Sequence, residues 1–107
     1  MKSKAEKLWL SDVASLGCVA CRNHGYGETP AELHHVRDGQ GTAQRASDFE
    51  VIPLCPPHHR GTAHPIIPSI HMQKRRFERE FGTERELLAQ TVREVEAVRA
   101  NRIGGTF

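Results

Sequence analysis

The sequence predicts one α+β domain with an N-terminal helix, two short extended segments and further helices toward the C-terminus. Its 107 residues suffice for a single domain. Apolar residues recur at helical spacing near both ends of the chain, whereas the middle holds two extended segments separated by a polar loop. We therefore expect an N-terminal helix within residues 1–17, a central core within residues 18–64 and C-terminal helices within residues 65–107.

The first helix is predicted over residues 4–16. Ser3 and Glu6 have the spacing of a capping box, in which each side chain bonds the backbone N–H of the other residue. Gly17 is a typical residue at the end of a helix. The apolar residues of this segment are spaced for one helical face, and they are Ala5, Leu8, Trp9, Val13 and Leu16.

The central core is expected to contain two extended segments and one short helix. Residues 32–36 and 49–54 are the extended segments, and the polar residues 37–48 form the loop between them. Pro53 restricts the second segment to an edge position or ends it. Two adjacent prolines then suit the first turn of a short helix over residues 56–61, where a missing N–H costs little.

Two more helices are predicted to complete the fold. Residues 71–81 place Phe77 and Phe81 four positions apart, so both lie on one helical face. A second capping box, T-E-R-E at residues 83–86, then opens a helix that runs to about residue 102.

The composition favours a metal-stabilised fold and is compatible with a nucleic-acid partner. Hydrophobic residues make up 37% of the chain and aromatic residues 6%, so the core is small for a domain with nine Gly and six Pro. The net charge of +2 permits DNA binding without requiring it. No apolar run approaches the ~20 residues that cross a bilayer, and the N-terminus lacks a signal-peptide core, which predicts a cytoplasmic protein without a membrane partner.

The three cysteines predict a structural zinc site. An odd number of cysteines in a cytoplasmic chain argues against a disulfide framework. Two residues separate Cys18 from Cys21, and two separate Cys55 from His58. Three thiolates and one imidazole form a closed tetrahedral zinc site without an open position for water. The alternatives are ordinary buried thiols, or a redox C-x-x-C that would need βαβ surroundings not apparent in this sequence.

Adjacent histidines indicate a second metal site. His34 and His35 end the first extended segment, where neighbouring side chains point to opposite sides. His58 and His59 lie on the short helix, where neighbours diverge by about 100°. If His58 completes the zinc site, His59 faces elsewhere and is available, with His34 and a later histidine, to bind an open metal beside His35.

Such a site suits the hydrolysis of a phosphodiester. A neutral imidazole accepts a proton from water near pH 7, and a metal ion stabilises charge on the phosphate and on the departing oxygen. The later histidine is either His64 or His71. Chance clustering is the alternative, because the chain contains seven histidines.

The segments "ELHHV" and "PLCPPHH", joined by a Gly-containing loop and a short strand, resemble the HNH or His-Me finger (ββα-metal) nucleases. The resemblance implies a ββα-metal core in which His34 and His59 bind the catalytic ion and His35 is the general base. HNH proteins usually carry an asparagine nine residues before the helix ligand, to hold the base. Glu50 stands there in this chain, so Glu50 or Asp48 is expected to support His35.

The chain is most similar to the Ref-type (recombination enhancement function) nucleases of bacterial viruses and prophages, over about residues 16–88. Relatives of this kind share "IH" before a basic helix, which favours His71 over His64 as the third ligand. They resemble a RecA-dependent endonuclease, which implies DNA and a RecA–DNA filament as partners in the bacterial cytoplasm.

Basic residues near the expected site predict contacts with the DNA backbone. They would neutralise phosphates, and they are Arg37, Arg60, Lys74 and Arg75. A solvated helix face is the alternative for the last two, because Glu78 and Glu80 interleave with the charges. We expect a monomer with structural Zn²⁺ and a second divalent ion. That ion is expected to be Mg²⁺ or Mn²⁺, although an all-imidazole site suits Zn²⁺ or Ni²⁺ in affinity.

The sequence thus predicts a metal-dependent DNA endonuclease that hydrolyses phosphodiester bonds. The main alternative is a zinc-stabilised DNA-binding module without catalysis, which leaves His34, His35, His59 and His71 unexplained. A zinc deaminase is disfavoured, because the chain has neither the H-x-E nor the P-C-x-x-C half of that signature at these positions.

Overall fold

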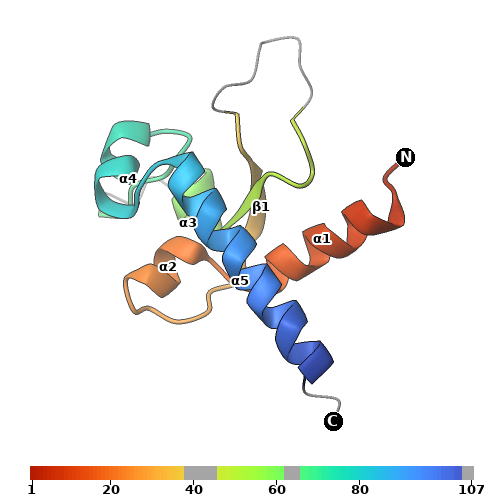
Figure 1. The fold of residues 1–107 in the computed structure, drawn as a ribbon. Helices are drawn as coiled ribbons and strands as arrows, with labels where there is room; N and C mark the ends of the chain where they lie inside the picture. Colours follow the sequence, from red (N-terminus) through yellow and green to blue (C-terminus); the bar gives the residue numbers. More distant parts are fainter. Residues whose placement is uncertain (38–45, 62–65, 105–107) are drawn as a thin grey trace.

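A computed structural model describes residues 1–37, 46–61 and 66–104 of the chain. Helices surround a two-stranded sheet near the middle of the molecule (Figure 1). In chain order the elements are α1 (Lys4–Ser15), α2 (Val19–Asn23), β1 (Glu32–His35), β2 (Val51–Leu54), α3 (Pro56–His59), α4 (Lys74–Phe81) and α5 (Glu84–Gly104).

Both predicted capping boxes are confirmed. At the start of α1, the Ser3 hydroxyl accepts from the Glu6 backbone N–H, and the Glu6 carboxylate accepts from that of Ser3. At the start of α5, Thr83 and Glu86 exchange the same pair of bonds, at 2.9 and 3.2 Å. These caps satisfy N–H groups that have no partner within the helix, so both helix starts are set by local sequence.

The sequence does not predict helix α2, because the glycines and the proline that follow Cys21 favour a loop. Instead, Val19–Asn23 forms a helix of five residues whose first three side chains are buried. The Cys18 side chain caps it by accepting from the Cys21 backbone N–H at 3.4 Å. Burial of this short apolar segment against the sheet therefore outweighs its weak local preference.

The two strands form an antiparallel pair, and the two histidines of the first strand lie on different faces of this sheet. His34 lies opposite Ile52, and His35 lies opposite Val51. Because side chains alternate along a strand, the two histidines point to opposite faces of the sheet. The strands are shorter than expected: residue 36 lies outside β1, and residues 49 and 50 belong to a turn and a bend.

All four residues of β2 are buried, because the two faces of the sheet pack against different groups. Ile52 and Leu54 belong to a cluster that contains the three cysteines, Phe77 and Leu87. Val51 belongs to a second cluster with Val13 of α1 and Val95 of α5. Helix α5 therefore contributes to both clusters, and the cysteine cluster lies on the face toward which His34 points.

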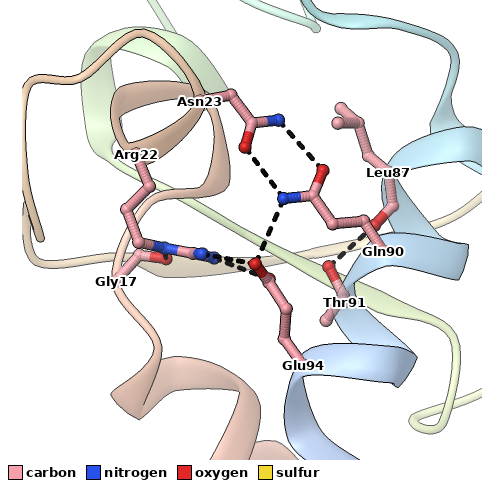
Figure 2. Close-up of polar contacts among 7 residues, drawn as sticks. All are labelled: Gly17, Arg22, Asn23, Leu87, Gln90, Thr91 and Glu94. Carbon is pink, nitrogen blue, oxygen red and sulfur yellow. Dashed lines mark hydrogen bonds and ion pairs between the residues drawn. The ribbon is translucent and has the colours of Figure 1, made fainter. Parts of the chain in front are cut away.

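Polar contacts fix α2 against α5 (Figure 2). The Arg22 guanidinium donates to both carboxylate oxygens of Glu94, at 2.7 and 3.0 Å, and its Nε donates to the Gly17 carbonyl. The side-chain amides of Asn23 and Gln90 exchange two hydrogen bonds. Bidentate pairs of this kind add direction as well as energy, so the helix that carries Cys21 has a defined orientation.

Helix α4 begins at Lys74 rather than at His71, since residues 70–72 form a turn. Helix α5 runs two residues further than predicted. Within the described parts of the chain, no helix combines the length and apolar character needed to cross a membrane.

Candidate metal centres

The first candidate metal centre consists of four buried side chains whose ligand atoms lie within 4.8 Å of one another: Cys18, Cys21, Cys55 and His58. The His58 Nδ1 lies 3.7 Å from the Cys18 Sγ, 3.6 Å from the Cys21 Sγ and 3.2 Å from the Cys55 Sγ. The Cys21 and Cys55 sulfurs are 3.8 Å apart. Tetrahedral zinc, with bonds of about 2.0–2.3 Å, separates its ligands by roughly 3.5–3.8 Å, so these residues fit the ion.

Two helix starts bring these ligands together. Cys18 is the cap residue of α2, and Cys21 lies in its first turn. Cys55 is the cap residue of α3, which begins with two prolines, and His58 follows three positions later on the same face. At the start of each of these helices, two residues three positions apart therefore supply two of the four ligands.

Burial disfavours the ionised, thiolate form of Cys18 and Cys55 when no cation is bound. Burial is the main cause that raises the pKa of Cys55 to about 12 and that of Cys18 above its usual value, and repulsion from the neighbouring thiolates adds to it. Burial also lowers the pKa of His58, which favours the neutral imidazole that a metal requires. A cation shared by the sulfurs offsets their repulsion, which is a further reason why the group suits zinc.

The second candidate metal centre is a group of three histidines from three segments of the chain. His34 of β1, His59 of α3 and His71 place their ligand atoms within 4.8 Å of one another. Their ring centroids are separated by 4.7–5.1 Å, and the Nε2 atoms of His59 and His71 are 3.1 Å apart. These are the three histidines that the resemblance favoured, whereas His64 lies outside the described residues.

Backbone hydrogen bonds place His71 beside α3. The Ile70 and His71 N–H groups donate to the carbonyls of His58 and His59, at 2.8 and 3.3 Å. Gly61 makes this approach possible, because its φ is +88° and a Cβ there would lie 2.9 Å from the Met72 sulfur. The turn before α4 is thus held against the helix that carries both adjacent histidines.

Consecutive residues of α3 belong to different groups. His58 is 5% exposed and lies with the cysteines, whereas His59 lies with His34 and His71. The divergence of neighbours around a helix accounts for this, as expected from the sequence. One short helix therefore connects the two candidate metal centres.

Carboxylates lie behind two of the three histidines. The Glu32 carboxylate contacts His59 Nδ1 at 2.8 Å and also accepts two bonds from Arg60. The Glu84 carboxylate contacts His34 Nε2 at 2.6 Å. The sequence pattern indicates residue 84 only as part of a helix start. Its role in the site depends on a contact across 50 residues that no local spacing reveals.

The electrostatics favour the neutral form of His34 and His71 and the ionised form of Glu84. Burial lowers the pKa of His34 and of His71. Burial opposes ionisation of Glu84, but the hydrogen bond from His34, with the Arg37 backbone N–H and the Lys74 charge, holds the pKa of Glu84 below its usual value. Neutral imidazoles are the form that binds a metal ion.

His35 lies outside the histidine group, on the other face of the sheet. Its Nε2 contacts the Asp48 Oδ1 at 2.8 Å, and the Asp48 Oδ2 accepts from the Lys2 ammonium at 2.6 Å. The hydrogen bond from Lys2, and to a smaller extent that from His35, lowers the pKa of Asp48 to about 2. Asp48 rather than Glu50 therefore contacts His35, while the Glu50 carboxylate accepts from Arg85 at 2.9 Å.

A surface cavity of about 570 Å³ adjoins His35, and Lys2, Asp48 and Phe49 contribute to its wall. The His35 side chain is 38% exposed, so water reaches the ring. His35 is thus accessible and hydrogen-bonded through one ring nitrogen only among the bonds described, which leaves its Nδ1 available to accept a proton.

The four basic residues expected to bind DNA have different surroundings. Arg37 and Lys74 line a cavity of about 210 Å³ together with His34, His71 and Glu84. Arg60 is 64% exposed although its guanidinium is paired with Glu32. Arg75 is exposed on α4. Two of the four therefore lie directly beside the histidine group.

The fold and these two groups define a small α+β domain with a closed Cys3His group and an open three-histidine group, both suited to metal ions. A family model described as "Recombination enhancement, RecA-dependent nuclease" matches residues 3–96. The chain therefore belongs to this family, which confirms the similarity to Ref-type nucleases. A comparison with curated proteins found no match.

Proposed function

We propose that the protein is a metal-dependent DNA endonuclease of the HNH (His-Me finger) type that acts in recombination. The observation that carries the proposal is the group formed by His34, His59 and His71, which has a donor set suited to a metal ion and lies in a member of a nuclease family. The antiparallel pair of strands followed by α3 supports a ββα-metal core, because these elements supply two of the three histidines.

In this proposal the Cys3His group holds Zn²⁺ and stabilises the fold. It has four protein ligands and therefore no open position for a substrate. The histidine group has three, which leaves room for water or a phosphate oxygen. When a divalent ion is bound there, it stabilises negative charge on the phosphate and on the leaving oxygen.

His35 is proposed to be the general base. Its contact with Asp48 orients the ring and leaves Nδ1 to take a proton from the attacking water. His34 and His35 lie on opposite faces of β1. The DNA backbone would therefore pass across the end of the strand, so that one phosphodiester comes within reach of both residues. The exposed ring of His35 and the cavity beside it are compatible with such a path.

Arg37 and Lys74 are proposed to hold the DNA backbone beside the metal, and Arg60 and Arg75 to extend the contact. The first two line the cavity next to His34 and His71, where a phosphate would lie close to both cations. The family description supports RecA–DNA filaments as the setting in which the enzyme cuts.

A zinc-stabilised DNA-binding module without catalysis is the second candidate. It accounts for the Cys3His group but assigns no role to the histidine group or to the Asp48–His35 contact. The two candidates differ in whether DNA is cut.

The test is to incubate the zinc-loaded protein with supercoiled plasmid, in chelator and then in Mg²⁺, Mn²⁺ or Zn²⁺, with and without RecA filaments. We expect nicked or linear DNA only when a divalent ion is present, because a phosphodiester is hydrolysed slowly without charge stabilisation. Intact plasmid under every condition, from protein that binds DNA, would instead support the non-catalytic module.

A further inference from the structure

The Glu84 carboxylate is an unusual feature of the histidine group, because it is almost fully buried and only half satisfied. The residue is 3% exposed, at the first position of α5. One oxygen contacts His34 Nε2 at 2.6 Å, while Oε1 is buried without a hydrogen-bond partner. The Lys74 ammonium lies 3.8 Å from Oε1, beyond hydrogen-bonding distance. Lys74 is half-exposed and pairs with Oε1 only at this distance, so a further cation nearby would compensate the buried charge more fully.

The contact also determines which nitrogen of His34 is available to an ion. A neutral imidazole carries one ring proton, and the nitrogen that donates this proton has no free electron pair. If Nε2 donates to the Glu84 carboxylate, only Nδ1 is left for a metal. The opposite arrangement holds at His59, where Glu32 contacts Nδ1 and the Nε2 atom faces the His71 Nε2 at 3.1 Å.

We propose that Glu84 is a positioning residue of this metal centre, which makes His34 bind the ion through Nδ1, while Glu32 makes His59 bind through Nε2. The inference rests on the metal-binding part of the proposed function and is independent of DNA cleavage. A carboxylate behind a metal-binding histidine fixes the ring orientation and increases the basicity of the ligand nitrogen. Two such carboxylates also offset the charge of a divalent ion.

The proposal gives α5 a direct connection to the site. Glu84 immediately follows the capping residue Thr83, so the start of α5 is fixed by local bonds while its first side chain reaches His34. The position of the start of α5 therefore determines where the carboxylate meets the His34 ring.

Metal affinity is the first measurement. Protein with zinc in the Cys3His group is titrated with further Zn²⁺ by calorimetry, and Glu84→Gln and Glu84→Ala are compared with wild type. We expect Glu84→Ala to weaken the second binding event by about 10- to 100-fold, the usual cost of losing a carboxylate behind a metal-bound histidine. Glu84→Gln is expected to lose less affinity for the second Zn²⁺, because its amide oxygen still accepts a hydrogen bond from His34.

Glu86→Gln is the matched control. It removes the same charge two residues later on α5, where the carboxylate caps the helix and contacts no histidine among the described bonds. We expect wild-type affinity for the second Zn²⁺. Thermal melting and zinc content of each variant verify that the fold and the Cys3His site are intact, so that a weaker second event is not caused by unfolding.

The second measurement identifies the ligand nitrogen. Nitrogen NMR of ¹⁵N-histidine in protein loaded with two Zn²⁺ should show Nδ1 coordination and a protonated Nε2 at His34, with the reverse at His59. Coordination of His34 through Nε2, unchanged affinity in both Glu84 variants, or no second Zn²⁺ in wild type would overturn the proposal. If both measurements agree with it but plasmid stays intact, the nuclease function fails while this inference stands.

Discussion

Replacing Cys55 with serine is expected to unfold the protein rather than only to lower its free energy of unfolding. The cysteines form part of the main core cluster, and a bound structural zinc contributes roughly 10–16 kcal/mol of apparent binding energy. The total stability of a folded domain is only about 5–15 kcal/mol. Circular dichroism and zinc content should therefore show loss of both the fold and the ion, and a strong chelator should have the same effect on wild type.

Val95→Ala is the control for this experiment. Val95 is fully buried in the second core cluster, away from the cysteines. Removing part of its side chain is expected to cost on the order of 1–3 kcal/mol and to lower the melting temperature while the zinc content stays unchanged. A Cys55→Ser protein that melts like Val95→Ala would show that the Cys3His group does not stabilise the fold through a metal.

Replacing His35 with alanine is expected to lower the rate of DNA cleavage by about 10²- to 10⁴-fold, the usual contribution of a general base. The side chain is 38% exposed, so its loss should leave the fold and both metal centres intact. Single-turnover cleavage of plasmid, at equal metal content and equal DNA occupancy, measures the chemical step without the binding step.

His24→Ala is the matched histidine control. Its ring packs against Tyr26 and Phe81, with centroids 6.0 and 4.4 Å away, and it belongs to neither metal group. Cleavage at the wild-type rate is expected for this variant. If His35→Ala also cuts at the wild-type rate, the base is another residue and His35 serves only as a partner of Asp48.

Short-range spacing made the Cys3His group predictable. The pairs Cys18–Cys21 and Cys55–His58 are each separated by two residues, and such spacings at the starts of helices bring ligands together whatever the rest of the fold does. The same helical geometry predicted that His59 would diverge from His58. His71 was predictable only from the resemblance, because backbone bonds to α3 across 12 residues place it there.

Contacts between distant segments could not be predicted in the same way. Helix α2 forms because Val19 and Ala20 are buried against the sheet, although local composition favours a loop. Glu84 reaches His34 from a helix 50 residues away. The sequence also leaves open whether Asp48 or Glu50 is the partner of His35, since this depends on a turn and bend at residues 48–50 that the extended pattern does not reveal.

The central claim is that α3 joins a structural ion to a catalytic ion through adjacent histidines. The most direct measurement is the rate at which His59→Ala protein, folded and with one zinc per chain, cleaves supercoiled DNA. We predict a native melting transition, a retained structural zinc and cleavage at least about 100-fold slower than wild type, because one of three ligands of the open site is lost. Cleavage at the wild-type rate, or loss of the structural zinc, would contradict the claim.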